Sequence, residues 1–323
     1  MQKDNYWQFM RGIGIIFVII IHCLYETTII SNNIFNIIVR CIINCSVPLF
    51  LFMAGYFIKI KDISSFYLKK IMRLIPSLLI WDLIYLIVFS IIAHNFDLKS
   101  IICSFMLSSH SAHLYYIYVL IQLFIISPLL FKILYTRFKY IPLLVSFIYN
   151  FFYVFLKVKY NFSIPFYNYW IFGWILYFYL GIVLRNNVIK LKKVKLIYLI
   201  IFYVLLLCES LLIYIYNNDF YFLSVSQLTL FNCLYCFGLL LYLFQNKTYL
   251  SNYFNNSLII NFGNYSFGIY LLHMFILFFV KRIFKLFKLN YYVYLLFVIA
   301  VTMILSYFLN KLYYKYKERK SYE

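Results

Sequence analysis

An arginine and a histidine lie eleven positions apart in the first apolar stretch of the chain, at Arg11 and His22. On an α-helix eleven residues make about three turns, so both side chains point the same way. The rise between them is roughly 16 Å, about half of the hydrocarbon thickness of a bilayer. An ionisable group at that depth is costly unless it faces a cavity or a partner. His22 is therefore the first candidate for chemistry, as a general base or as a nucleophile.

A second pair of residues suits an anionic ligand. Lys70 and Arg73 are three residues apart, next to the predicted span 74–93, and are therefore neighbours on one helical face. Two cations near a helix start, where backbone N–H groups are also available, suit a phosphate or a pyrophosphate. The alternative is an ordinary basic cytoplasmic loop, because such loops are enriched in lysine and arginine.

The composition decides which elements position these side chains. The 323 residues are 66% hydrophobic and only 12% charged, with a mean hydropathy of +0.88, which leaves too little polar surface for a soluble domain. We predict an all-α fold, a polytopic integral-membrane helical bundle that forms a single domain over residues 1–323. About ten spans are expected, approximately at 8–30, 36–58, 74–93, 114–134, 140–156, 168–185, 195–216, 226–244, 260–280 and 290–312.

The formal net charge of +20 is distributed unevenly along these spans. With a cytoplasmic N-terminus, 21 of the 29 basic residues fall in inside segments, which is the asymmetry of the positive-inside rule. We therefore expect both termini in the cytoplasm and contacts with anionic lipid headgroups, and we expect no nucleic-acid partner. The basic cluster at 281–288 disagrees, because it falls on the nominal outside. It indicates either an interfacial amphipathic helix or a misplaced span boundary.

No sequence pattern indicates a metal or redox centre. The seven cysteines are odd in number and mostly lie in apolar runs, so they predict no disulfide framework. Cys233 and Cys236 are separated by two residues but have no second cysteine pair and no histidine near them, and we expect no metal. Asp82 and Glu209 lie inside predicted spans. Each is expected to pair with an intramembrane base or a tyrosine hydroxyl, because an isolated carboxylate in lipid would become protonated.

Five segments, taken in order, resemble the membrane-bound acyltransferase 3 family, whose members acylate cell-surface sugars. They are Arg11…His22, Pro48–Gly55, Lys70-x-x-Arg73, His113–Pro128 and Phe262–His273. Tyr179–Leu184 is a weaker match to the mid-chain signature of the family. The commoner Arg-x-x-Arg pattern is Lys70-x-x-Arg73 here, and a lysine meets a phosphate as a point charge rather than as a bidentate fork.

The resemblance implies an O-acyltransferase of the bacterial plasma membrane. Acetyl-CoA from the cytoplasm would donate an acetyl, or another short acyl group, to a hydroxyl of a cell-surface or precursor polysaccharide. We expect His22 and Glu26 to be catalytic, because Glu26 lies one helical turn beyond His22 and is placed to orient the imidazole. Three basic residues are candidates for binding acyl-CoA: Arg11, Lys70 and Arg73. Three further residues are candidates for binding substrate: His113, Tyr270 and His273.

Two other classes of membrane protein share the predicted architecture. A lipid-linked oligosaccharide flippase or exporter would have ten spans and basic inner loops, but it would not need Arg11, His22 and Arg73 as a set. A polysaccharide polymerase or ligase is expected to carry a large outer loop, whereas the longest one predicted here, at 94–113, has about 20 residues. His110 and His113 flank the outer entry of the fourth predicted span, on the side expected to meet the acceptor.

Overall fold

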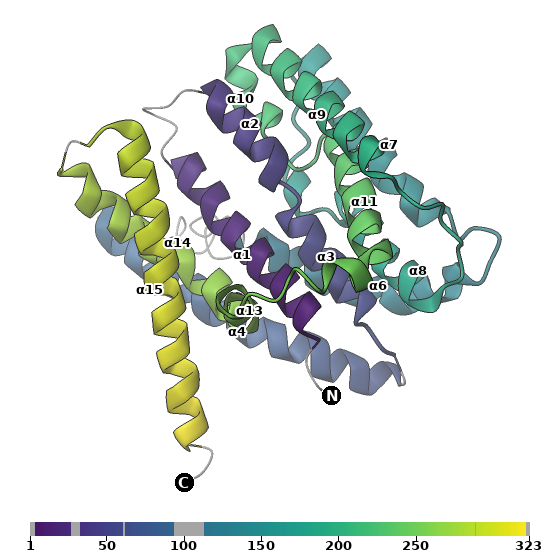
Figure 1. Ribbon diagram of the computed structural model, residues 1–323, viewed down its shortest axis with the longest axis horizontal. Coiled ribbons are helices and arrows are strands. Elements are labelled where there is room, and N and C mark those ends of the chain that lie inside the picture. The colour runs from purple at the N-terminus through teal and green to yellow at the C-terminus, as the bar shows by residue number, and fades with distance from the viewer. Residues whose placement is uncertain (1–3, 27–32, 61, 94–112, 288, 321–323) are drawn as a thin grey trace. The chain divides into compact units, whose positions relative to one another are not determined.

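The computed structural model describes residues 4–26, 33–60, 62–93, 113–287 and 289–320. These ranges hold helices and connecting segments and no strand, as an all-α bundle requires (Figure 1). The α-helices are α1 (Asn5–Glu26), α2 (Asn33–Ile43), α3 (Ser46–Tyr56), α4 (Ile63–Ala93), α6 (Tyr115–Leu134), α7 (Ile141–Tyr160), α8 (Ile175–Asn186), α9 (Leu196–Tyr216), α10 (Tyr221–Ser224), α11 (Leu230–Gln245), α12 (Lys247–Leu250), α13 (Ser257–Asn264), α14 (Ser266–Lys285) and α15 (Tyr291–Lys320).

Eight helical stretches in the described residues are long and apolar enough to cross a membrane, and the chain is a multi-pass helical membrane protein. Two of the ten predicted spans, 168–185 and 226–244, correspond instead to the shorter helices α8 and α11. α8 has 12 residues and therefore a length of about 18 Å, less than the roughly 30 Å of a hydrocarbon core. The chain before it is irregular and includes left-handed backbone at Asn161 and Phe166.

The chain forms two compact units. Unit 1 comprises residues 1–50 and 191–323, and unit 2 comprises residues 51–190. Unit 1 contains α1, α2, the start of α3, and α9 to α15. Unit 2 contains the rest of α3, together with α4, α6, α7 and α8. The expectation of one acyltransferase domain over residues 1–323 stays a prediction.

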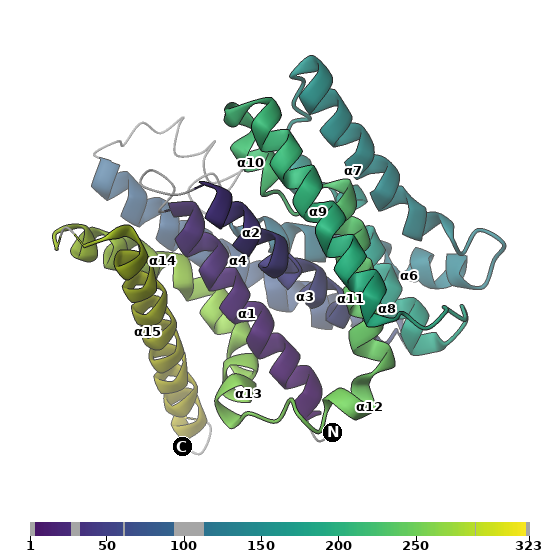
Figure 2. The ribbon, with the colours of Figure 1, turned by 45° about the horizontal axis from the view of Figure 1, so that its top comes forward.

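In unit 1, α1 lies directly against α13, with α14 and α15 as further neighbours (Figures 1 and 2). The contact with α13 depends on two glycines. A Cβ at Gly12 would overlap the carbonyl oxygen of Ile259, and a Cβ at Gly263 would overlap that of Gln8. The two backbones therefore approach more closely than any larger residue would permit, as small residues allow in membrane helix packing.

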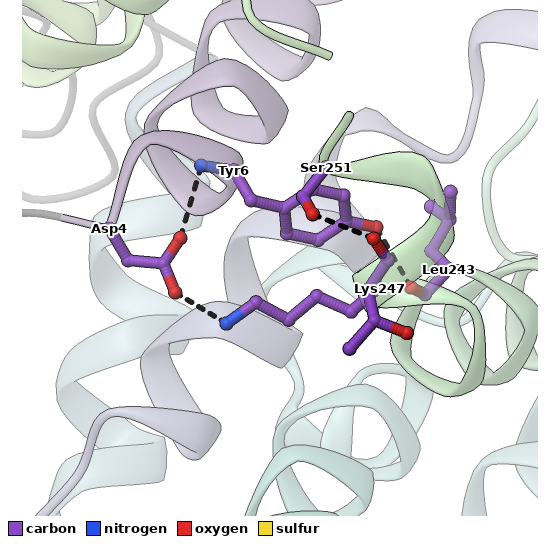
Figure 3. A network of polar contacts seen from close by, with 6 residues as sticks. Asp4, Tyr6, Leu243, Lys247 and Ser251 are labelled. Atoms are coloured by element: carbon purple, nitrogen blue, oxygen red, sulfur yellow. Dashed lines mark hydrogen bonds and ion pairs between the residues drawn. The ribbon is translucent and has the colours of Figure 1, made fainter. Parts of the chain in front are cut away.

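The N-terminal end of α1 is anchored by a polar network around Asp4 (Figure 3). The Asp4 carboxylate accepts a hydrogen bond from the Tyr6 backbone N–H at 3.1 Å, which caps the helix, and forms an ion pair with Lys247. The Tyr6 hydroxyl donates to the carbonyl oxygen of Leu243 at 2.8 Å. The Lys247 ammonium also lies 5.5 Å from the ring centroid of Trp7. These contacts tie the start of α1 to α11 and α12.

In unit 2, α3 and α8 cross closely, and this crossing brings together the motif segments Pro48–Gly55 and Tyr179–Leu184. A Cβ at Gly55 would overlap the Phe178 carbonyl oxygen, and one at Gly181 would overlap that of Phe52. Arg185 of α8 donates to the Tyr56 carbonyl oxygen at 3.0 Å and satisfies an acceptor at the C-terminus of α3. The glycines in these motifs therefore serve helix packing.

Candidate functional site

The structure brings His22 of α1 and His273 of α14 together in unit 1. The ring centroids are 5.2 Å apart and the ring planes are inclined by 50°. His273 is 0% exposed, and His22 is partly buried. Two imidazoles at this separation are neighbours in a membrane-spanning bundle, where ionisable side chains are expensive and usually functional.

The hydrogen bonds of His273 indicate the tautomer of its ring. Its Nδ1 lies 2.6 Å from the carbonyl oxygen of Tyr270 and 3.2 Å from that of Ile269. A carbonyl oxygen only accepts hydrogen bonds, so Nδ1 carries the proton and donates it. In a neutral ring, Nε2 is then the acceptor. The backbone of the helical turn that directly precedes His273 therefore orients its ring, as a hydrogen-bond acceptor orients the ring of a catalytic histidine.

The other predicted members of this site on α1 have the following positions. α1 is continuous from Asn5 to Glu26, so Arg11 and His22 lie on one helix about three turns apart, as predicted. Arg11 is half-buried. Glu26 is the last residue of α1, and its side chain lies outside the described part of the structure, as does all of His110. The catalytic role of Glu26 stays a prediction.

Lys70 and Arg73 lie on α4 in unit 2, and both side chains are exposed. The expectation that they stand near a helix start is wrong, because α4 already begins at Ile63. Asp62 caps it: the carboxylate accepts from the Ser65 backbone N–H at 2.8 Å and from the Ser64 hydroxyl at 2.7 Å, and these bonds lower the pKa of Asp62 to about 2. The first N–H groups of α4 thus lie about two to three turns away from the basic pair, and that of Ser65 is already bound by Asp62. The basic pair must therefore attract an anion through its side chains.

The remaining substrate-binding candidates are buried. His113 is 3% exposed, and its ring packs edge-on against Tyr85 of α4 with centroids 5.1 Å apart. It therefore lies in the interior of unit 2 rather than at a surface. Tyr270 is 8% exposed, and its ring centroid is 6.0 Å from that of His273. Tyr270 belongs to the surroundings of the histidine pair, and the role of His113 in binding substrate stays a prediction.

The two intramembrane acids have different surroundings. The Glu209 carboxylate accepts hydrogen bonds from the backbone N–H groups of Leu230 at 3.2 Å and Phe231 at 3.0 Å. It thus binds the positive end of α11 rather than the base or tyrosine hydroxyl that the sequence predicted. Asp82 is 3% exposed. It lies near Tyr169, whose pKa is raised to about 12 by burial and, to a smaller extent, by Tyr118 and Asp82.

The basic cluster at 281–288 continues a membrane helix. α14 runs without a break from Ser266 to Lys285, so the cluster forms no separate amphipathic helix up to that residue. Arg282 and Lys285 lie in its last turn, where cations interact favourably with the helix dipole. The guanidinium carbon of Arg282 is 4.0 Å from the ring centroid of Phe278. The side of the membrane on which this end lies stays a prediction.

Arg40 is a further residue of this region that was not predicted from the sequence. It is buried in α2 and donates a hydrogen bond to the carbonyl oxygen of Ile21, the residue before His22. The signal was present, since an arginine inside an apolar run is itself a functional candidate. Among the described residues, no group of three or more histidine, cysteine or acidic side chains is arranged to hold a metal ion. Cys233 and Cys236 are buried and not disulfide-bonded.

Comparison with known proteins yields one match. A family model described as an acyltransferase domain matches residues 4–311, nearly the whole chain. No curated protein and no solved structure matches the chain. The matched range includes the histidine pair of unit 1 and the basic pair of unit 2.

Proposed function

Because this chain belongs to the acyltransferase 3 family of membrane proteins, we propose that it is an O-acyltransferase that acetylates a cell-surface polysaccharide or its precursor. The donor is acetyl-CoA, or the CoA thioester of another short acyl group, supplied from the cytoplasm. The acceptor is a sugar hydroxyl. The protein resides in the bacterial plasma membrane with both termini in the cytoplasm.

The observation that carries this proposal is the pair of facing imidazoles on α1 and α14. A sugar hydroxyl is a weak nucleophile at neutral pH, so its acylation requires a base or an acyl-enzyme intermediate. An imidazole serves either purpose, and the donor bond that orients the His273 ring is already in place. Arg11, on the same face of α1 as His22, adds a cation that suits the phosphates of the donor.

The reaction can be written with two roles for His22. As a general base, His22 takes the hydroxyl proton while the sugar oxygen attacks the thioester carbonyl carbon. The carbon–sulfur bond breaks, and the CoA thiolate leaves and is protonated by the imidazolium. As an acyl carrier, the His22 imidazole first attacks the same carbon, the carbon–sulfur bond breaks, and the ring proton passes to the CoA thiolate. The sugar hydroxyl then attacks the acyl-imidazole, takes the acyl group and returns its proton to the ring. In either case the products are an O-acyl ester and free CoA thiol.

Lys70 and Arg73 are proposed to bind the phosphates of the acyl-CoA. Their exposure on α4 leaves both cations accessible to a ligand. Charge-assisted hydrogen bonds to phosphate are shorter and about twice as strong as neutral ones. Arg73 is expected to contribute more than Lys70, because a guanidinium binds an anionic group with two parallel bonds.

The test is transfer by the purified protein. Full-length protein in lipid nanodiscs is incubated with acetyl-CoA labelled in the acetyl group and with the polysaccharide from cells that lack this gene. Mass spectrometry of that polysaccharide, with and without the gene, identifies the acetylated position. Label in ester linkage to the glycan supports the proposal. Unchanged polysaccharide acylation in the deletion strain, together with a defect in glycan export, would favour the transporter instead.

A further inference from the structure

Arg40 ties three segments of unit 1 together at His22. This residue of α2 is 8% exposed. Its Nη2 donates to the carbonyl oxygen of Val225 at 2.9 Å, and its Nε donates to the side-chain oxygen of Asn44 at 3.0 Å. Its Nη1 lies 3.4 Å from the carbonyl oxygen of Ile21, the residue directly before His22. One guanidinium therefore links α2, the C-terminal part of α1 and the chain that follows α10.

The segment bound by Arg40 is itself unusual for a membrane protein. Residues 225–229, between α10 and α11, are not helical, and each is between 0% and 9% exposed. Non-helical backbone at membrane depth is tolerated where protein buries it or where it lines a cavity, and broken helices often mark binding sites. Because Arg40 contacts both Ile21 and Val225, this break lies close to the turn of α1 that carries His22.

Asn44 also binds the 225–229 segment, but its side-chain hydrogen bonds are to Val225 and Arg40 and not to α1. Its side-chain amide donates to the carbonyl oxygen of Val225 at 3.1 Å, and Asn44 is 1% exposed. Arg40 of α2 and Asn44, the residue directly after α2, thus share one acceptor. The contact to Ile21 distinguishes Arg40 from Asn44, and it joins the α2 cluster to the helix that carries the candidate catalytic histidine.

We propose that Arg40 is a positioning residue for acyl transfer: it holds the turn of α1 that carries His22 against the 225–229 segment and so keeps the His22 ring opposite His273. The inference rests on the proposed function. A guanidinium suits this task, because its planar fork makes several directed hydrogen bonds at once. Misplacement of a reacting group by about 1 Å costs about 10²-fold in rate, so a small shift of this turn has a large effect.

The first experiment compares three variants in nanodiscs with acetyl-CoA and the glycan acceptor. Arg40→Gln, which keeps one NH₂ group as a donor but loses the charge and the fork, is expected to lower kcat by about 10- to 10²-fold with little change in the KM for acetyl-CoA. Arg40→Lys should recover part of that loss. Asn44→Ala, the matched control, removes the bond of Asn44 to Val225 and the acceptor of the Arg40 Nε, but it leaves the bonds of Arg40 to the carbonyl oxygens of Ile21 and Val225. It should lower the melting temperature with little effect on kcat.

A second experiment measures position without relying on activity. His22→Cys and His273→Cys are combined in a background in which the native cysteines are replaced, and oxidative cross-linking is followed by mass spectrometry. Cross-linking is expected with Arg40 present and is expected to be lost with Arg40→Gln, whereas Asn44→Ala should retain it. This readout distinguishes failure of the inference from failure of the proposed function, because it needs no substrate.

Three results would overturn the inference. The first is a cross-link of equal yield with and without Arg40. The second is a loss of kcat in Asn44→Ala as large as that in Arg40→Gln, which would indicate a general structural role. The third is the absence of a cross-link in every background, because the two histidines would then not face each other. If the parent protein transfers no acyl group but the cross-link depends on Arg40, only the proposed function fails.

Discussion

The histidine pair of unit 1 and the basic pair of unit 2 are assembled in opposite ways. His22 and His273 come from different helices, and the Nδ1 of the His273 ring already donates to a backbone carbonyl oxygen within the protein. Lys70 and Arg73 come from adjacent turns of one helix and expose their side chains. A side chain enclosed by packing has a fixed geometry, as bond-making chemistry requires, whereas an exposed cation attracts an anion without fixing its position.

The comparison also shows that the role of an arginine depends on whether backbone carbonyl oxygens of the protein already hold its guanidinium. Arg185 in unit 2 is basic, like Arg73, but it donates to the Tyr56 carbonyl oxygen and stabilises the end of α3. Arg40 in unit 1 is likewise held by backbone carbonyl oxygens. We therefore expect substitutions in the histidine region to lower kcat, and substitutions of the exposed pair to raise the KM for the donor.

The largest expected effect is that of His22→Ala. Loss of a general base lowers the rate by roughly 10²–10⁴-fold, and loss of an acyl carrier lowers it further. Acetyl transfer by purified protein measures the effect, with size-exclusion chromatography to establish that the variant is monodisperse. Near-normal acetylation of the glycan in cells that carry His22→Ala would refute the assignment of chemistry to this region.

His273→Phe tests whether the second imidazole contributes more than packing. Phenylalanine keeps an aromatic ring at the contact with His22 but has no nitrogen to accept or donate a hydrogen bond. We expect kcat to fall by about 10- to 10²-fold, as for a catalytic group that has lost its orientation, with an unchanged KM for acetyl-CoA. An activity equal to that of the parent would reduce His273 to a packing residue.

Arg73→Ala is expected to raise the KM for acetyl-CoA by about 10- to 10²-fold, because a hydrogen bond to a charged group contributes about 1.5–3 kcal/mol. Lys70→Ala should have a smaller effect in the same direction, and Lys70→Arg should be tolerated. Lys59→Ala, another exposed basic residue of unit 2, is the control and should leave the KM unchanged. Calorimetry checks the result: equal affinity for acyl-CoA in both alanine variants would place the donor site elsewhere.

The last test concerns the side of the membrane on which each segment lies, and no effect on activity is expected from its substitutions. Ser65→Cys marks the start of α4, and Ser109→Cys marks a segment outside the described residues. In a cysteine-free background, a membrane-impermeant thiol reagent should label Cys at 109 in intact cells, and Cys at 65 only after permeabilisation. The reverse pattern would place the basic pair on the side away from cytoplasmic acyl-CoA.

The sequence by itself determined the helical membrane fold and the placement of Arg11 and His22 on one helix, because hydropathy and helical periodicity are properties of neighbouring residues. It also identified the family through an ordered set of local motifs. It made two predicted spans, 168–185 and 226–244, longer than the α-helices found there, because each range also includes residues that precede the start of α8 or α11. It also set the start of α4 too late, although Asp62 and the two serines after it form a recognisable cap.

Only the tertiary structure decided which distant residues meet. Nothing local places His273 beside His22, or the carbonyl oxygens of Ile21 and Val225 around Arg40. It likewise gave Glu209 the N-terminus of α11 as its partner. These contacts join segments far apart in the chain, and they depend on how closely helices pack, as Gly12 and Gly263 allow for α1 and α13. Packing is a property of facing surfaces, and a single stretch of sequence contains only one of the two.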